Sequence, residues 1–179
     1  MSLLAIPTSC HYCAGVVRFV NKKQVLIWDD EPSNELYVCV TCAARVGVHQ
    51  GTKHPLGMLA DAETRRARHL AHLAFDGLWI AGHVGRFKGY AWLASKLGVE
   101  HAICHIGWVD AEVCEVIIDI CKTPPTASEL EGLRSKRPWK FSYRLDRPIG
   151  LCDLGYTAMQ GKSPSKAIIQ ELQNEHAPF

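Results

Sequence analysis

Two CxxC pairs are the strongest constraint on how this chain of 179 residues folds. Cys10 and Cys13 form the first pair, and Cys39 and Cys42 form the second after the 25 residues from 14 to 38. A CxxC segment bends as a tight turn whose two thiolates converge, and two such turns supply the four ligands of a tetrahedral site. The residues between the pairs form short β-prone runs, as in a zinc ribbon. The spacing therefore predicts a zinc site on these four cysteines.

The four thiolates leave two other chemistries open. An iron–sulfur cluster accepts the same ligand set, whereas a redox-active cysteine pair would account for only one of the two motifs. His11 and His49 lie close to the pairs in the sequence and are alternative ligands. Because four protein ligands leave no position for water, we expect the metal to contribute folding energy and no chemistry.

The remaining cysteines fit a helical core. Cys114 and Cys121 share one helical stripe with Ile117 and Ile118, and free cysteine packs as a small hydrophobic residue. The sharper alternative is a second metal site on Cys104, His105, Cys114 and Cys121. Cys152 is isolated and carries no inference.

Beyond residue 50 the hydrophobic pattern predicts helices. Asp61 is a candidate N-cap for the first helix, a second is expected over residues 86–97 before Gly98, and a third over residues 110–121. The expected buried stripe of the first helix consists of Ala67, Leu70, Ala71, Ala74 and Leu78.

The resulting fold class is α+β, with a zinc ribbon packed on a small helical subdomain. We expect the ribbon over residues 1–50, the helical subdomain over 51–123 and a C-terminal extension of mixed structure over 124–179. Pro124 and Pro125 mark the last boundary. In the extension, residues 139–143 alternate as in a strand, and Ser163 is a candidate N-cap for a final short helix.

The cysteine pairs are embedded in a longer series of motifs. Residues 44–52 read ARVGVHQGT, residues 55–57 PLG, residues 91–94 AWLA and residues 104–107 CHIG. Over residues 8–121 this order resembles the zinc-finger-containing domains of unknown function found in bacteriophages and bacteria. The resemblance implies a zinc ribbon joined to a small helical part, with zinc on the four cysteines, and it implies no catalytic residue.

The basic residues suggest a nucleic-acid partner, although the net charge is only +2. Arg65, Arg68, His69 and His72 share one face of the first expected helix, and residues 134–147 interleave six basic residues with three aromatic ones. Ordinary solvated faces would give the same patterns. The hypothesis assigns nucleic-acid contacts to Arg65, Arg66, Arg68, Lys136, Arg137, Trp139, Lys140 and Arg144.

Two other functions stay open. The chain is alternatively a protein-binding inhibitor or modulator of a host enzyme or defence system, with Trp108 or Trp139 in the contact. Metal-assisted hydrolysis is the third interpretation. Its candidate polar residues are His49, Thr52, His72, Asp76 and His105, and their spacing selects no reaction.

Membrane and export signals are missing from the sequence pattern. No apolar run approaches the roughly 18 residues that span a bilayer, and the first nine residues lack the basic start of a secretory signal. We therefore expect a cytoplasmic protein, in the bacterial host if it is phage-encoded, whose cysteines bind metal or pack and do not form disulfides.

Overall fold

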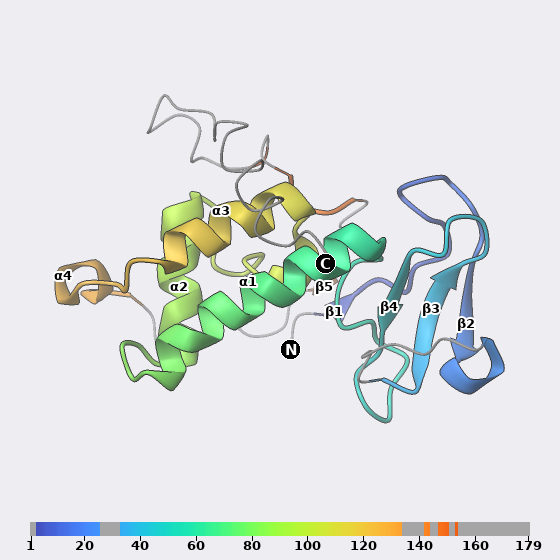
Figure 1. Cartoon of the computed structure of the whole chain (residues 1–179), viewed down its shortest axis with the longest axis horizontal. Helices are drawn as coiled ribbons and strands as arrows, with labels where there is room; N and C mark the ends of the chain where they lie inside the picture. The colour runs from blue at the N-terminus through green and yellow to red at the C-terminus, as the bar shows by residue number, and fades with distance from the viewer. Residues whose placement is uncertain (1–2, 26–32, 134–141, 144–146, 151–152, 154–179) are drawn as a thin grey trace, which may run out of the picture.

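The α+β class is confirmed by the computed structural model of the chain, which describes residues 3–25, 33–133, 142–143, 147–150 and 153. Figure 1 shows a small sheet at one end of the molecule and the helices at the other. The elements that position the functional site are the strands β2, β3 and β4 and the helices α1, α2 and α3.

The sheet is a three-stranded antiparallel ribbon in the order β2-β3-β4. Its strands are β2 (Val17–Asn21), β3 (Glu35–Cys39) and β4 (Arg45–Gly47), and a 3-10 turn, η1 (Lys22–Val25), follows β2. Val17 pairs with Cys39, so the register places each CxxC pair at the same end of the hairpin. The β-prone runs that were expected between the pairs therefore include the two paired strands of this hairpin.

The three long helices begin and end close to the expected residues. They are α1 (Ala62–Ile80), α2 (Arg86–Leu97) and α3 (Ala111–Cys121). The Asp61 carboxylate accepts a hydrogen bond from the backbone N–H of Thr64, and Asp110 caps α3 in the same way. Gly98 ends α2 in the left-handed conformation, with φ of 67°.

Smaller elements complete the described chain. A 3-10 turn, η2 (Ile106–Trp108), leads into α3, and the short helix α4 (Ala127–Leu130) follows it. The strand β1 (Leu3–Leu4) pairs in parallel with β5 (Ser142–Tyr143), and Figure 1 places this pair between the ribbon and the helices.

The expected buried stripe of α1 is confirmed at Ala71 and Leu78, and Ala67 and Ala74 are partly buried against the same core, but it is wrong at Leu70. Leu70 is 41 % exposed, whereas the buried positions of the helix are Thr64, Arg68, Ala71, Phe75 and Leu78. The stripe is rotated because Phe75 fills the core against Tyr90 of α2, while the Arg68 side chain finds backbone acceptors inside the protein. An arginine therefore occupies a position where periodicity alone predicts the polar face.

Two separate hydrophobic clusters stabilise the described part of the chain. The larger one joins α1, α2 and α3 and contains the buried residues Cys104, Cys114 and Cys121, as packing predicts. The smaller one lies in the ribbon and includes two of the zinc-site cysteines, Cys10 and Cys39. The ribbon thus has little apolar core apart from its metal site.

Residues 48–61 connect the ribbon to α1 and fix the position of that helix. Arg45 of β4 and Ala60 exchange two backbone hydrogen bonds of 2.9 and 3.0 Å directly before the Asp61 cap. Gly57 packs on η2 so closely that an added Cβ would lie 2.4 Å from the carbonyl oxygen of Gly107. The connection is held against both halves of the protein.

Part of the expected C-terminal structure lies outside the described residues. This includes Trp139, Phe141, Cys152 and the expected helix after Ser163, whereas Tyr143 belongs to β5. Within the described part of the chain, every helix is too short or too polar to cross a membrane.

Candidate functional site

The four CxxC cysteines converge on a site that fits zinc. The sulfurs of Cys10 and Cys42 are 3.6 Å apart, those of Cys13 and Cys39 are 3.5 Å apart, and all four lie within 4.8 Å of one another. Tetrahedral coordination with Zn–S bonds of about 2.3 Å places sulfurs about 3.8 Å apart, so the cluster needs only small adjustments to hold the ion. The four thiols together form a zinc site.

The two CxxC turns have the same backbone structure. In each, the N–H of the residue after the second cysteine donates to the carbonyl of the first cysteine, from Ala14 to Cys10 and from Ala43 to Cys39. The N–H groups of Cys10 and Cys39 then donate back to the carbonyls five residues further on. The first cysteine of each pair is buried and the second is exposed, and the four sulfurs converge on one centre.

Backbone donors prepare one thiol of the site for metal binding. The backbone N–H of Cys42, helped by that of Thr41, lowers the pKa of Cys39 to about 6. The thiolate is the form that binds metal, and these donors favour it at Cys39, whereas burial raises the pKa of Cys10 to about 12. The second turn therefore supplies hydrogen bonds to the Cys39 sulfur as well as two of the metal ligands.

Both turns close through an alanine in the left-handed region, with φ of 56° at Ala14 and 59° at Ala43. Glycine adopts this conformation without the steric cost of a Cβ. We therefore expect Ala14→Gly and Ala43→Gly each to raise the free energy of unfolding by about 0.5 kcal/mol. This is the net effect, because the strain that glycine relieves in the folded state exceeds the entropy that it adds to the unfolded chain. Thermal unfolding measures this; Ala62→Gly in α1, which should destabilise, is the matched control.

The alternative ligands do not join the metal site. His11 lies beside the cluster with its ring against Tyr12, and His49 lies in a different cleft. Among the described residues, the four CxxC cysteines are the single group of three or more potential ligands close enough to share an ion, so Cys104, His105, Cys114 and Cys121 form no second site there.

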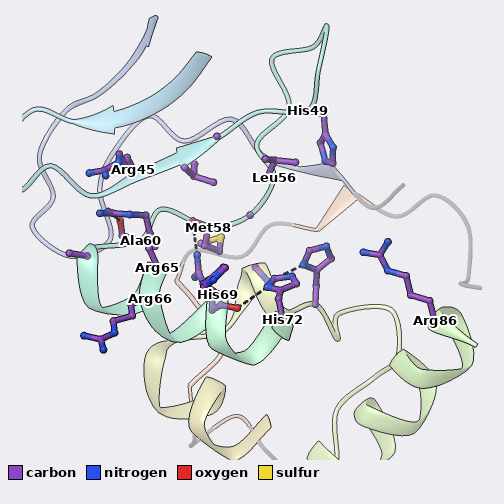
Figure 2. A pocket seen from close by; sticks show the side chains of 17 residues that line it. Arg45, His49, Leu56, Met58, Ala60, Arg65, Arg66, His69, His72 and Arg86 are labelled. Carbon is purple, nitrogen blue, oxygen red and sulfur yellow. Dashed lines mark hydrogen bonds between the residues drawn. The ribbon is translucent and has the colours of Figure 1, made fainter. Parts of the chain in front are cut away.

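A cleft of about 740 Å³ lies between the ribbon and α1 and is lined by many basic side chains (Figure 2). Its walls come from β4, the 48–61 connection, α1, the start of α2 and η2. No aspartate or glutamate of the described residues lines it. Its basic side chains are Arg45, Arg65, Arg66, Arg68, Arg86, His49, His69, His72 and His105.

The fold brings two arginines of the cleft together from β4 and α1. Arg45 comes from β4 and Arg65 from the first turns of α1, and Figure 2 shows them on facing walls. Burial lowers the pKa of Arg45, and the positive charge of Arg65 lowers it further. Arg66 and Arg86 are exposed at the edges of the cleft. Like charges on facing walls favour an anion between them.

Arg68 lies at the base of this cleft. The helix-face hypothesis required a surface residue at this position, but Arg68 is buried. Its side chain is 8 % exposed, and its Nε and Nη1 donate to the carbonyls of Val109 and Met58 at 2.9 and 2.7 Å. The other basic residues expected near this face of α1, which are Arg65, Arg66, His69 and His72, all line the cleft.

The other proposed nucleic-acid contacts, Lys136, Arg137, Trp139, Lys140 and Arg144, lie outside the described residues. The sequence pattern did not predict Arg45 and Arg86 as members of a cationic site, because both lie far in the sequence from the arginines of α1. Of the polar residues considered for catalysis, His49, His72 and His105 reach the cleft, whereas Thr52 and Asp76 do not line it.

Comparison with known proteins places this arrangement in a family. The family model of a zinc-finger-containing domain matches residues 6–124, which include the zinc site, the cleft and the three long helices. The chain belongs to this family. No curated protein and no solved structure was found to match it.

One histidine of this zinc-finger-containing domain couples the cleft to pH. The Nδ1–H of His72 donates to the carbonyl of Arg68 at 2.8 Å. Burial lowers the pKa of His72 below its ordinary 6.5, and the charges of Arg86 and Arg68 act in the same direction, whereas the Arg68 carbonyl and Asp76 oppose it. His72 is therefore neutral at pH 7.

Acidification should destabilise the domain through His72. Because the folded form binds this proton less readily than the unfolded chain, stability is lost as the pH falls below about 6.5. We expect the Tm to fall by a few degrees between pH 7 and pH 5. His72→Asn, whose amide can still donate to Arg68, should flatten that dependence, and His83→Asn on the exposed turn after α1 should not. Equal pH profiles for all three proteins would contradict this role.

Proposed function

We propose that this zinc-finger-containing domain binds nucleic acid through the cationic cleft between its ribbon and α1. The observation that carries the proposal is the lining of the cleft, in which five arginines and four histidines are accompanied by no carboxylate of the described residues. A recess of one sign on two facing walls focuses the electrostatic field on a bound polyanion.

The type of cation favours phosphate. Arginine presents a planar fork of donors that matches two phosphate oxygens, and contacts to phosphate dominate sequence-independent affinity for nucleic acid. Arg65, Arg66 and Arg86 reach the cleft from two helices, so a strand in the cleft would meet donors from several directions. The zinc ribbon contributes Arg45 and the opposite wall.

The cleft offers no stacking surface for bases. Among the described residues, no phenylalanine, tyrosine or tryptophan lines it. Single-strand binders that stack bases use such aromatic platforms, whereas this cleft presents arginine, imidazole and small apolar groups. We therefore infer that it contacts the sugar–phosphate backbone and has little sequence preference.

The proposal predicts steeply salt-dependent binding. Four arginines other than Arg68 line the cleft, and neutralising four phosphates gives a slope of log K against log salt concentration of about −3 to −4. Fluorescence anisotropy with labelled single-stranded DNA, duplex DNA and RNA, each in two unrelated sequences, measures it between 50 and 200 mM NaCl. Absence of binding at 50 mM salt, or a slope near zero, would refute the proposal.

A protein partner is the second candidate, and a different surface favours it. Trp108 is 2 % exposed and is therefore unavailable, contrary to the expectation from the sequence, while Trp139 lies outside the described residues. Large apolar side chains are instead exposed on α1 and the start of α2, at Leu70, Leu73, Ile80 and Phe87. A salt-resistant protein band in a pull-down from bacterial lysate, lost on Leu73→Glu, would support this function.

A further inference from the structure

The Arg68 guanidinium is a buried charge without a counter-ion. Its two hydrogen-bond acceptors are neutral backbone carbonyls, of Val109 and Met58. Its third nitrogen, Nη2, is buried and has no hydrogen-bond partner among the described residues. No carboxylate of the described structure forms an ion pair with it. Arg68 lines the cleft as one of its five arginines.

This arrangement costs free energy as long as the charge is uncompensated. Guanidinium groups stay protonated in proteins, so Arg68 cannot escape the cost by losing its proton. Removing an ion from water carries a penalty that an opposite charge nearby offsets, and the attraction is strongest where the surroundings have a low dielectric constant. The charges of Asp110 and Asp61 favour the protonated Arg68, but neither carboxylate forms an ion pair with its guanidinium.

We propose that the floor of the cleft is a phosphate subsite centred on Arg68, in which a bound phosphate group supplies the missing counter-charge. The inference deepens the proposed function and rests on it for the source of the phosphate, the backbone of a nucleic acid. Arg65 and His69 lie one turn or less from Arg68 on α1 and extend the subsite toward the cleft opening. Inorganic pyrophosphate presents the same anionic phosphate groups as a small molecule and therefore serves as the probe.

Phosphate binding at Arg68 should also tighten the junction of the two subdomains. Met58 belongs to the connection that leaves the ribbon, and Val109 directly precedes the cap of α3. Arg68 therefore joins the connection to the helical core through its two hydrogen bonds. A ligand that stabilises the arginine in this position stabilises the whole folded domain, because ligand binding to the native state alone raises its unfolding temperature.

The experiment compares thermal unfolding of the zinc-loaded chain in sodium pyrophosphate and in sodium chloride of equal ionic strength. At about ten times the dissociation constant, pyrophosphate should raise the Tm of the wild-type protein by about 3 °C or more above the chloride value. Arg68→Met removes the charge and keeps much of the apolar stem, so this extra rise should disappear. Arg68→Lys keeps the charge and should retain part of it. Arg18→Met, on β2 away from the cleft, makes the same change in net charge and is the matched control.

A second measurement needs no Arg68 variant and covers the case in which Arg68→Met fails to fold. In ¹H–¹⁵N spectra of the wild-type protein, the Nε–Hε signal of Arg68 should shift on addition of pyrophosphate, with the same dissociation constant as the thermal effect. Shifts at Arg65 and Arg66 without a shift at Arg68 would overturn the subsite. An equal Tm rise in pyrophosphate and chloride, or a full rise in folded Arg68→Met, would overturn it as well.

Nucleic-acid binding by the same proteins separates the two proposals. If wild type and folded Arg68→Met bind DNA or RNA equally, the proposed function stands and the subsite is wrong. If pyrophosphate acts through Arg68 while no nucleic acid binds at 50 mM salt, the subsite stands and its ligand is a free phosphate compound. If Arg68→Met loses both the pyrophosphate effect and nucleic-acid binding, while the control variant keeps them, the subsite and the proposed function are both supported.

Discussion

Removal of zinc is expected to unfold the ribbon and leave most of the helical structure intact. The hydrophobic cluster of the ribbon contains seven buried residues, and Cys10 and Cys39 are two of them. The helical cluster contains eighteen buried residues and none of the zinc ligands. Small units with so little apolar core depend on metals or disulfides, and structural zinc sites contribute about 10 kcal/mol or more to folding.

The measurement is a chelator titration followed by two signals. Metal analysis of freshly purified protein should give one zinc per chain and no iron, and chelation should make four further thiols reactive. The NMR signals of β2, β3 and β4 should collapse, while the helical circular dichroism at 222 nm falls only modestly. Cys39→Ser should reproduce the effect, whereas Cys121→Ala, in the helical core, should keep the full zinc content.

Two outcomes would contradict the zinc assignment. One is purified protein without zinc or iron that still shows the native β-sheet signals, and the other is Cys39→Ser with unchanged metal content. If the purified protein contains iron and shows a visible absorption band, the four cysteines hold an iron–sulfur cluster and not zinc. Because β4 and the 48–61 connection form one wall of the cleft, loss of zinc should also abolish any phosphate binding there.

The features that sequence analysis predicted correctly are those fixed by local rules. A CxxC turn brings its own two thiols together, and the β-prone runs between the pairs determine the hairpin that brings the two turns together. The helix ends follow from Asp61, Gly98 and Asp110, whose capping depends on neighbouring backbone groups alone. Burial of Cys114 and Cys121 follows from helical periodicity.

The cleft and the role of Arg68 depend on contacts between distant residues. Arg45 and Arg65 face each other because a backbone bridge joins β4 to Ala60, a pairing that no local pattern indicates. Arg68 is buried because the carbonyls of Met58 and Val109 meet its donors there, which overrides the polar character of the residue. Hydropathy treats arginine as exposed and leucine as buried, so the predicted stripe of α1 omitted Arg68 and included the exposed Leu70, although it was correct at Ala71 and Leu78.

Charge reversal at the cleft opening should produce the largest loss of nucleic-acid binding. Arg65 is half-buried and donates one hydrogen bond to the carbonyl of Ala60, whereas Arg66 is exposed. The double substitution Arg65→Glu, Arg66→Glu removes two phosphate contacts and adds two repulsive charges. We expect an affinity loss of roughly 100-fold near 0.1 M salt, and a salt slope smaller by about 2.

The control is chosen so that a change in net charge cannot explain the result. Arg18→Glu combined with Lys88→Glu alters the net charge by the same amount at positions that do not line the cleft, one on the ribbon and one on α2. Zinc content and Tm report whether each variant is folded. If the cleft is the binding site, the Arg65, Arg66 variant loses affinity for nucleic acid and the Arg18, Lys88 variant keeps most of it. Equal losses would mean that nucleic acid senses only the overall charge, and unchanged affinity in the Arg65, Arg66 variant would exclude the cleft as the binding site.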